Sequence, residues 1–514
     1  MEYLFLPVKQ FYILVQLNTL SAMKNFNILF FVILLSITGY SQDRKLEADA
    51  SVTTKGEVVI KGKRVPYTAT TGTQPVWDES GKVIASLFHT YYERTDVTDR
   101  STRPLVISFN GGPGSASVWM HIAYTGPKIL KIDDEGYPVQ PYGIKDNPNS
   151  ILDVADIVYV NPVNTGYSRI LDPEANRSIF FGVNEDIKYL AEWVNTFITR
   201  KNRWLSPKYL IGESYGTTRV SGLAKELQNS QWIFLNGVVL VSPTDLGIER
   251  EGPVSYALDL PYFTATAWYH KKLVPELQNK DLDEILPLSE EYAVNVLLPA
   301  LAKGGFLPDG EKQKIAEKMS YYSGIDKKVF LQHNLSLPVS YFWKELLRED
   351  GFTVGRLDSR YTGIDKTDAG DRPDYNSELI AWEHSFAPAI NYYIQNHLNY
   401  KTEIKYNLFG PVHPWNREGD TTGDDLRLAM AENPYLHVMI QSGFYDGATQ
   451  YFNAKYTMWQ LDPSGKLKDR LRFEGYRSGH MMYLRSEDLK TANDHLRDFI
   501  KKSTFTNGTP AKYR

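Results

Sequence analysis

The chain has 514 residues, of which 42% are hydrophobic and 23% are charged, and its formal net charge is −4. This length allows a large core or a core that carries a sizeable insertion, and the composition is ordinary for a soluble globular protein. With so small a net charge and no long basic block, nucleic acid is not an expected partner. The sequence has no cysteine, which excludes disulfides, cysteine nucleophiles and thiolate metal sites.

The N-terminal segment is typical of a leader for export. From Met23, one lysine precedes a short apolar run and then small residues, as in a secretory signal peptide. The run is shorter than the about 20 apolar residues that a membrane-spanning helix needs. We therefore predict a signal peptide over 23–41 and an upstream extension, residues 1–22, that results from the choice of start site. The mature protein is predicted to be periplasmic or extracellular, with no stable membrane anchor.

Strand and helix patterns alternate in the first half of the chain. Alternating apolar and polar residues over 57–92 predict antiparallel strands. Short, wholly apolar runs predict strands that are buried on both faces, at 104–110, 155–161, 208–212 and 234–242. Helices are predicted over 184–198, with Asn184 as the N-cap, and over 217–228. This alternation is typical of an α/β fold with a mainly parallel sheet and helices on both faces.

The pattern changes from residue 246 to residue 430, where the sequence is mostly helix-like and loop-like. One helix is predicted to begin at Ser289 and to end at Gly304, with an interruption at Pro299. Strand signals return over 436–442 and 471–476, and a last helix is predicted over 487–501.

A helical block between strands of one sheet predicts a lid inserted into a core domain. The predicted organisation is a first part of the core over 43–245, a lid over 246–430 and a second part of the core over 431–514.

The sharpest local motif is the G-x-S-x-G pattern over 212–216. It follows a predicted buried strand and precedes a predicted helix, which is the context of a tight turn that exposes a serine hydroxyl. The helix N-terminus also places positive partial charge beside a developing oxyanion. Ser214 is therefore the predicted nucleophile, and a simple tight turn is the alternative.

A serine nucleophile needs a base, and the base needs a carboxylate that orients it. In an α/β-hydrolase the chain order is Ser, acid, His, with the acid and the His after late strands. Asp446 follows the predicted strand 436–442, and His480 follows the strand 471–476. His437 lies within a strand and is predicted to be a packed histidine.

Acyl transfer also needs two backbone donors for the oxyanion. The residue after the nucleophile, Tyr215, supplies one. A glycine-rich turn over 110–114, directly after an early strand, is placed to supply the other. A phosphate cradle is the competing interpretation, but no Lys-Ser/Thr follows these glycines and no G-x-G-x-x-G spacing is present.

Together these motifs resemble the serine carboxypeptidase family (peptidase family S10) of the α/β-hydrolase superfamily, in a bacterial-type form. The matching stretches are FNGGPGSAS (109–117), VNPVNTGYSR (160–169), GESYG (212–216), QSGFYDGATQ (441–450) and SGHMMY (478–483). The resemblance implies an α/β-hydrolase fold with a mostly helical lid, and a catalytic triad of Ser214, Asp446 and His480. It also implies an oxyanion hole from the amides of Gly112 and Tyr215. It implies no cofactor and no metal.

The resemblance further implies a binding site for the C-terminal carboxylate of a peptide, made by Asn110, Gly111 and Glu213. A carboxylate beside Glu213 requires a shared proton, because two close carboxylates do not both stay ionised cheaply. Peptidase activity should therefore be favoured at acidic pH.

The chain departs from the family pattern at three positions. Tyr124 stands where many members have a second Glu that pairs with the Glu before the nucleophile. We expect the Tyr124 phenol to donate a hydrogen bond to Glu213, and the acid preference to be weaker than in the family. Ser115 replaces a common Cys, and Thr449 stands near the place of another.

The leading hypothesis is a serine carboxypeptidase that releases C-terminal amino acids from peptides or proteins through an acyl-enzyme. An esterase or acyltransferase on the same scaffold is the alternative, because fold does not determine substrate. A catalytically silent binding protein is the third hypothesis.

Overall fold

A sheet of ten strands runs through the described part of the chain, which in this computed structural model comprises residues 45–172, 176–505, 508 and 510–513. The predicted extension (1–22) and signal peptide (23–41) lie outside the described residues. The described residues from Leu46 onward form one compact unit. Within the described residues, no helix combines the length and the apolar character needed to cross a membrane.

The sheet has the strand order β1-β2-β3-β7-β4-β9-β10-β13-β14, and β8 pairs with β3. The first three strands and the β3–β7 pair are antiparallel, whereas all neighbours from β7 to β14 are parallel. The predicted α/β class is therefore confirmed. The strands are β1 (Ser51–Ile60), β2 (Lys63–Trp77), β3 (Val83–Arg94), β4 (Leu105–Phe109), β7 (Asp156–Val160), β8 (Arg169–Ile170), β9 (Lys208–Glu213), β10 (Gly237–Val241), β13 (His437–Gly443) and β14 (Leu471–Tyr476).

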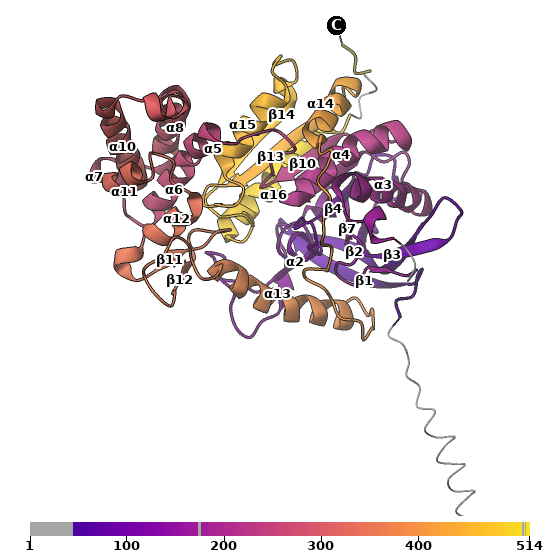
Figure 1. Cartoon of the computed structure of the whole chain (residues 1–514). Coiled ribbons are helices and arrows are strands. Elements are labelled where there is room, and N and C mark those ends of the chain that lie inside the picture. Colours follow the sequence, from indigo (N-terminus) through magenta and orange to yellow (C-terminus); the bar gives the residue numbers. More distant parts are fainter. Residues whose placement is uncertain (1–44, 173–175, 506–507, 509, 514) are drawn as a thin grey trace, which may run out of the picture. The chain divides into compact units, whose positions relative to one another are not determined.

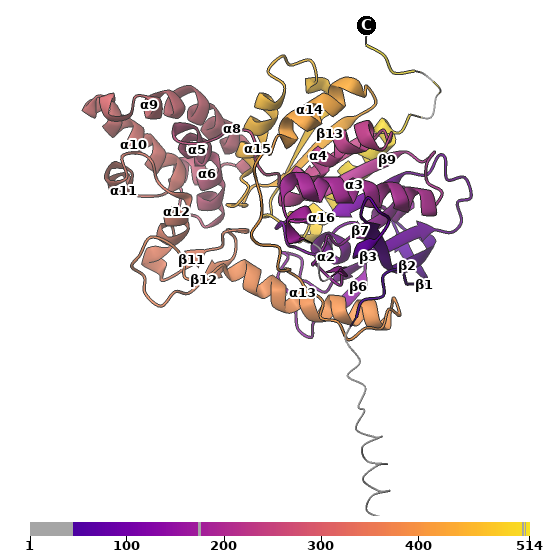
Figure 2. The ribbon, with the colours of Figure 1, turned by 45° about the vertical axis from the view of Figure 1, so that its right-hand side comes forward.

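Helices cover both faces of this sheet (Figures 1 and 2). Alternate residues of the central strands join different hydrophobic clusters: Leu210 and Val238 face one layer, and Ile211 and Val239 face the other. The first layer contains α3 (Val183–Arg200), α4 (Tyr215–Ser230), α14 (Thr422–Glu432) and α15 (Tyr451–Leu461). The second contains α2 (Val118–Ala123), α13 (Ser377–Asn396) and α16 (Ser486–Ser503).

A separate group of helices forms the lid, which Figure 1 shows beside the β13 and β14 edge of the sheet. These helices enclose a hydrophobic cluster of their own. They are α5 (Pro253–Leu258), α6 (Leu260–Tyr269), α7 (Pro275–Gln278), α8 (Leu282–Tyr292), α9 (Leu298–Ala302), α10 (Asp309–Ser323), α11 (Lys327–Gln332) and α12 (Val339–Glu345). Two short strand pairs complete the fold: β5 (Lys128–Leu130) with β6 (Ile144–Asp146), and β11 (Thr353–Val354) with β12 (Thr362–Gly363).

The segment 246–430, predicted as the lid, holds two kinds of structure. Helices α5 to α12 pack on one another, whereas the apolar residues of α13 and α14 belong to the two layers on the sheet. Figure 2 shows α13 passing below α2. The helical insertion thus contributes a separate lid and also part of the core's outer layers.

Two predicted helix boundaries were wrong. The helix predicted to start at Ser289 begins seven residues earlier, because Asp281 and Glu284 form a capping box that satisfies the first amides. Ser289 is buried inside α8. The N-cap of α3 is Gly182 and not Asn184, because Gly182 O already accepts a helical hydrogen bond from Asp186 N at 3.0 Å.

Candidate active site

Ser214 occupies a strained turn between the end of β9 and the start of α4. Its φ angle is 57°, which is unusual for a residue with a Cβ. A hydrogen bond of 2.9 Å from Ser214 N to Val241 O ties the turn to the neighbouring strand β10. The side chain is partly exposed. The predicted strand–turn–helix context of Ser214 is therefore confirmed.

Glycines around this turn allow backbone segments to approach closely. A Cβ on Gly212 would overlap the carbonyl oxygen of Gly216, and a Cβ on Gly216 would lie 3.0 Å from Asn110 O. A Cβ on Gly111 would lie 2.5 Å from Tyr215 N. The glycines of both motifs therefore bring the turn over 110–114 against the turn of Ser214.

His480 and Asp446 form a buried pair, with 2.7 Å between His480 Nδ1 and Asp446 Oδ2. Asp446 follows β13 and His480 follows β14, as predicted. The Thr449 hydroxyl donates to the same carboxylate oxygen at 2.6 Å, and the amides of Ala448 and Thr449 donate to Oδ1 at 2.8 and 3.1 Å. An ionised carboxylate only accepts hydrogen bonds, so His480 Nδ1 carries the proton and Nε2 is free to accept one.

The pKa values of this pair are shifted toward an ionised acid and a basic histidine. Burial alone raises the pKa of Asp446, but His480 and the Thr449 hydrogen bonds outweigh it and leave the pKa below its ordinary value. Burial lowers the pKa of His480, but the charges of Asp446 and Glu213 outweigh it, and the pKa lies above its ordinary value. Asp446 is thus placed to stabilise an imidazolium at position 480.

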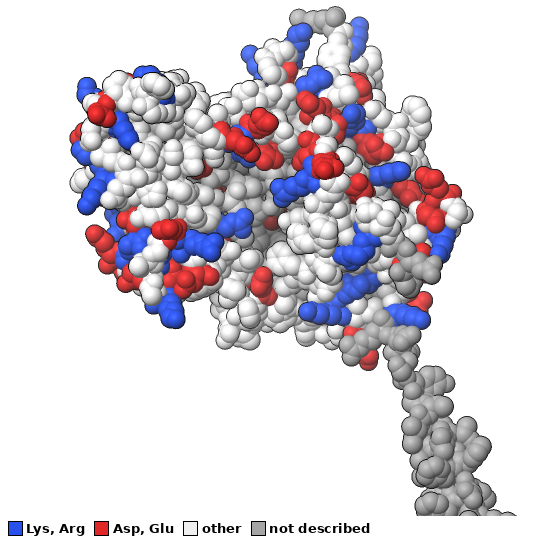
Figure 3. Space-filling model, viewed as in Figure 1, with Lys and Arg blue, Asp and Glu red and all other residues white. Residues whose placement is uncertain are grey.

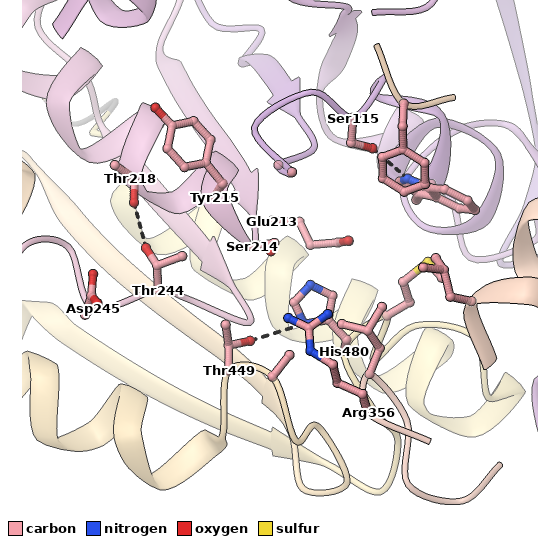
Figure 4. Close-up of a pocket in the computed structure, with 18 of the residues that line it drawn as sticks. Ser115, Glu213, Ser214, Tyr215, Thr218, Thr244, Asp245, Arg356, Thr449 and His480 are labelled. Carbon is pink, nitrogen blue, oxygen red and sulfur yellow. Dashed lines mark hydrogen bonds between the residues drawn. The ribbon is translucent and has the colours of Figure 1, made fainter. Parts of the chain in front are cut away.

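Ser214 and His480 line one cavity of about 340 Å³. Figure 4 shows both side chains in this cavity with Glu213 beside Ser214, and Figure 3 shows the hollow on this face of the molecule. Part of its wall is apolar, built by Trp119, Leu357, Leu379, Trp382, Phe409 and Met481. In the part of the chain that the structure describes, no group of three or more His, Asp or Glu side chains could hold a metal ion.

Two free amides also face this cavity region. Gly112 and Tyr215 both line it. Neither backbone N–H has a hydrogen-bond acceptor among the described residues. Gly112 has a φ of 104°, a conformation that favours glycine. The structure thus places two unused donors beside Ser214, one from each predicted turn.

A buried arginine that the sequence reasoning missed holds the glycine-rich turn in place. Arg219, on α4, donates to Asn110 O at 2.6 Å and forms an ion pair of 2.6 Å with Asp186 of α3. Both charged side chains are almost fully buried. An ion pair with this geometry ties the turn at 110 to α4, which begins directly after Ser214, and to α3.

Glu213 receives its hydrogen bond from a different tyrosine than the sequence suggested. The Tyr483 hydroxyl donates to Glu213 Oε2. The Tyr124 hydroxyl instead donates to Gln441 Oε1 at 2.8 Å, and its ring stacks on Tyr483 with centroids 4.7 Å apart. The expected Tyr124–Glu213 hydrogen bond was therefore wrong. Tyr124 supports the ring of the residue that makes the bond, and Tyr483 is the last residue of the SGHMMY stretch.

Burial dominates the acid–base behaviour of Glu213. It raises the pKa of this carboxyl to about 7, against the opposing effects of His480 and Tyr483. Glu213 and Gly111 line the cavity. Asn110 is fully buried behind them, and hydrogen bonding with its side chain is one of the effects that oppose the raised pKa of Glu213. A side-chain amide therefore lies next to a carboxyl that is easily protonated.

These features define an α/β-hydrolase with a serine, a histidine and an aspartate at the expected strand ends. A family model described as serine carboxypeptidase matches residues 65–284. Over this stretch, the chain is similar to the serine carboxypeptidase family.

Individual relatives match over shorter stretches. "Serine carboxypeptidase-like 16" from Arabidopsis thaliana is 30% identical over 176 residues, which are 32% of this chain and 39% of the relative. "Serine carboxypeptidase S10 family member 1" from Dictyostelium discoideum is 29% identical over 133 residues, 26% of this chain and 29% of the relative. The chain thus spans well under half the length of these curated relatives.

One solved structure has a similar fold over most of both chains. It is Kex1(delta)p, a prohormone-processing carboxypeptidase from Saccharomyces cerevisiae, with a TM-score of 0.50 and 13% sequence identity. The match covers 85% of this chain and 92% of that one. At this identity the likeness concerns the fold.

Proposed function

We propose that the protein is a serine carboxypeptidase that releases C-terminal amino acids from peptides or proteins. The observation that carries this proposal is the position of Ser214, on a strained turn in the same cavity as the hydrogen-bonded His480–Asp446 pair. Ser214 attacks the carbonyl of the last peptide bond, and His480 Nε2 takes its proton. Asp446 orients His480 and stabilises the imidazolium.

The two free amides then act on the tetrahedral intermediate. The N–H groups of Gly112 and Tyr215 donate to its oxyanion. His480 returns the proton to the amine, the C–N bond breaks and the last amino acid leaves. A water molecule, deprotonated by His480, attacks the acyl-enzyme, and Ser214 regains its proton as the shortened peptide departs.

Glu213, Gly111 and Asn110 are the proposed binding site for the terminal carboxylate. With its pKa raised to about 7, Glu213 is protonated below that pH and donates a hydrogen bond to the carboxylate. The buried side-chain amide of Asn110, a hydrogen-bonding neighbour of Glu213, is a second donor. A free C-terminus is therefore the substrate feature that this corner of the cavity suits.

The substrate class is tested with three kinds of compound: N-blocked dipeptides, the same dipeptides with a C-terminal amide, and simple esters. We expect release of the last amino acid from the free-acid dipeptides at a kcat/KM about tenfold or more above that for the amides, since a buried donor without its charged partner costs about 1.5–3 kcal/mol. Rapid hydrolysis of esters with no cleavage of dipeptides would favour the esterase or acyltransferase alternative. Inertness to all three compounds and to a fluorophosphonate probe would favour a binding protein.

The pH profile tests the role of Glu213. Because its pKa is raised to about 7, the group is neutral below that pH and charged above it, where it repels the substrate carboxylate. We expect kcat/KM for free-acid dipeptides to fall about tenfold per pH unit above this pKa. Ester hydrolysis, which involves no terminal carboxylate, should lack this decline.

Glu213→Gln is the matched variant, because glutamine is isosteric, always neutral and still accepts from Tyr483. Its dipeptide profile should lose the alkaline decline and keep the acidic limb, on which His480 becomes protonated. A wild-type dipeptide rate that rises steadily from about pH 5 to pH 8, through the ordinary range of a histidine pKa, would contradict the proposal.

The leader-like sequence over 23–41 supports a further part of the proposal, export of the mature protein. N-terminal sequencing of the exported protein should find a start after residue 41. An intact Met1 would rule out cleavage of this segment.

A further inference from the structure

An arginine from the lid side of the chain lines the cavity that holds Ser214 and His480. This residue, Arg356, lies between β11 and β12 and is exposed. Its guanidinium makes no hydrogen bond or ion pair with any described residue. Figure 4 shows the Arg356 side chain next to His480. A guanidinium presents five donors in a planar fork that matches a carboxylate.

The backbone at Arg356 is held firmly although its side chain is free. Gly447 N, next to Asp446, donates to Arg356 O at 2.9 Å, and His480 N donates to Leu357 O at 2.6 Å. From the other side, Leu357 N donates to the buried Glu378 at 2.8 Å. The loop is therefore tied to the segments of both Asp446 and His480, which gives the guanidinium a defined place relative to the reacting groups.

Two carboxylates in the neighbourhood of Arg356, those of Asp245 and Asp259, interact with another arginine, Arg250. Both act electrostatically on Arg250, which is largely buried. Burial also raises the pKa of Asp259 to about 7, which reduces its negative charge in acidic solution. Arg356 acts electrostatically on the buried Glu378, whose pKa burial raises to about 7, but it forms no ion pair with a carboxylate among the described residues.

The position of Arg356 within the cavity indicates which substrate residue it meets. A second cavity of about 420 Å³ adjoins the first, and both are lined by Asp245, Arg356 and Ala448. Glu213 lines only the first. A peptide with its terminal carboxylate at Glu213 and its scissile carbonyl at Ser214 leads its preceding residues away from Glu213, toward the second cavity.

We propose that Arg356 is a specificity-determining residue that binds an acidic side chain on the penultimate residue of the substrate, the one whose carbonyl Ser214 attacks. The proposal deepens the carboxypeptidase function and rests on it. The substrate class is a peptide that ends in Asp or Glu followed by one further residue.

The test compares N-blocked dipeptides with Glu, Gln or Lys before a common C-terminal residue, at a pH near 6, where the substrate Glu is ionised (pKa about 4.3). Glu and Gln have the same shape, so their ratio of kcat/KM reports the charge. We expect wild type to prefer Glu over Gln by about tenfold, the value of one charge-assisted hydrogen bond. The preference should weaken as salt is added, because the guanidinium is exposed.

Arg356→Gln should bring the Glu/Gln ratio close to one, mainly through KM. Arg356→Lys should keep part of the preference, because the charge remains and the planar fork is lost. Arg417→Gln is the matched control. Arg417 is also exposed and lines the first cavity, but not the second, so the same loss of charge there should leave the ratio at the wild-type value.

The outcomes separate this inference from the function on which it rests. Cleavage of all three dipeptides by wild type at similar rates would overturn the role of Arg356 and leave the carboxypeptidase function intact. If Arg417→Gln lost the Glu preference to the same extent, the role of Arg356 would also be overturned, because the overall positive charge of the cavity would then explain the preference. A Glu preference at the last residue instead of the penultimate one would refute the placement. No cleavage of any dipeptide would end both proposals.

Discussion

Replacing His480 by alanine is expected to lower kcat for a blocked dipeptide by on the order of 10⁶-fold, with KM changed only a few-fold. His480 Nδ1 is held 2.7 Å from Asp446 Oδ2, so its Nε2 is the group that we propose as the acceptor of the Ser214 proton. Without it, Ser214 keeps its hydroxyl proton and is a weak nucleophile at neutral pH. The proposed binding of the substrate carboxylate at Glu213 and Gly111 does not require the imidazole.

Single and double variants are compared in the same assay. Residues that act as a unit are strongly non-additive, so Ser214→Ala combined with His480→Ala should be no slower than either single variant. Labelling by a fluorophosphonate should also disappear in each. His437→Gln is the control. His437 begins β13, its Nδ1 lies 3.0 Å from Tyr435 O, and it does not line the cavity of Ser214. If the losses of kcat in the two single variants added up in the double variant, Ser214 and His480 would not act in one shared catalytic mechanism.

The sequence allowed the candidate site to be predicted where chemistry and local structure coincide. Ser214, Asp446 and His480 each follow a strand with an uninterrupted or alternating apolar pattern. Short strands of that kind can be recognised from the sequence alone. The glycine motifs are equally local, since a Cβ on Gly111 or Gly212 would overlap the neighbouring backbone. Chain order then links three distant segments into one prediction.

The parts that the sequence did not reveal depend on contacts between distant segments. Tyr483 reaches Glu213 across 270 residues of sequence, and no local pattern distinguishes it from Tyr124, which lies nearer in sequence. Arg356 is one of many charged residues in the lid sequence, and only the hydrogen bonds of its loop to the triad segments place it in the cavity.

Errors within the lid have a different physical cause. Leu282 begins α8 because Asp281 and Glu284 form a reciprocal capping box, a signal that is present in the sequence. The prediction instead started the helix at Ser289, which is itself a good N-cap residue type. Ser289 is buried within α8, where its hydroxyl donates to Leu286 O at 3.0 Å. The two plausible caps, Asp281 and Ser289, lie eight residues apart and are distinguished only by the packing of the whole helix.

Asp446→Asn should lower kcat by about 10⁴-fold without unfolding the site, as expected when the orienting acid of a serine–histidine–aspartate triad becomes an amide. The asparagine carbonyl oxygen can still accept from the amides of Ala448 and Thr449, as Asp446 Oδ1 does at 2.8 and 3.1 Å. Its Nδ2 replaces the oxygen that accepts from His480 Nδ1. An amide nitrogen only donates, so His480 must present an unprotonated Nδ1 to it and carry its proton on Nε2. In that tautomer the His480 Nε2–H is a hydrogen-bond donor, so Nε2 cannot accept the proton of the Ser214 hydroxyl.

The same change should also move the acidic limb of the pH profile. Asp446 is a main cause of the raised pKa of His480, against the opposing effect of burial. In the variant that pKa falls, so the residual activity should persist to lower pH than in wild type. Asp245→Asn is the matched control, because Asp245 lines the same cavity, and its carboxylate accepts a hydrogen bond from Gly247 N and none from His480 or Thr449. An Asp446→Asn enzyme that kept more than a tenth of the wild-type kcat would show that His480 does not depend on this carboxylate for its tautomer.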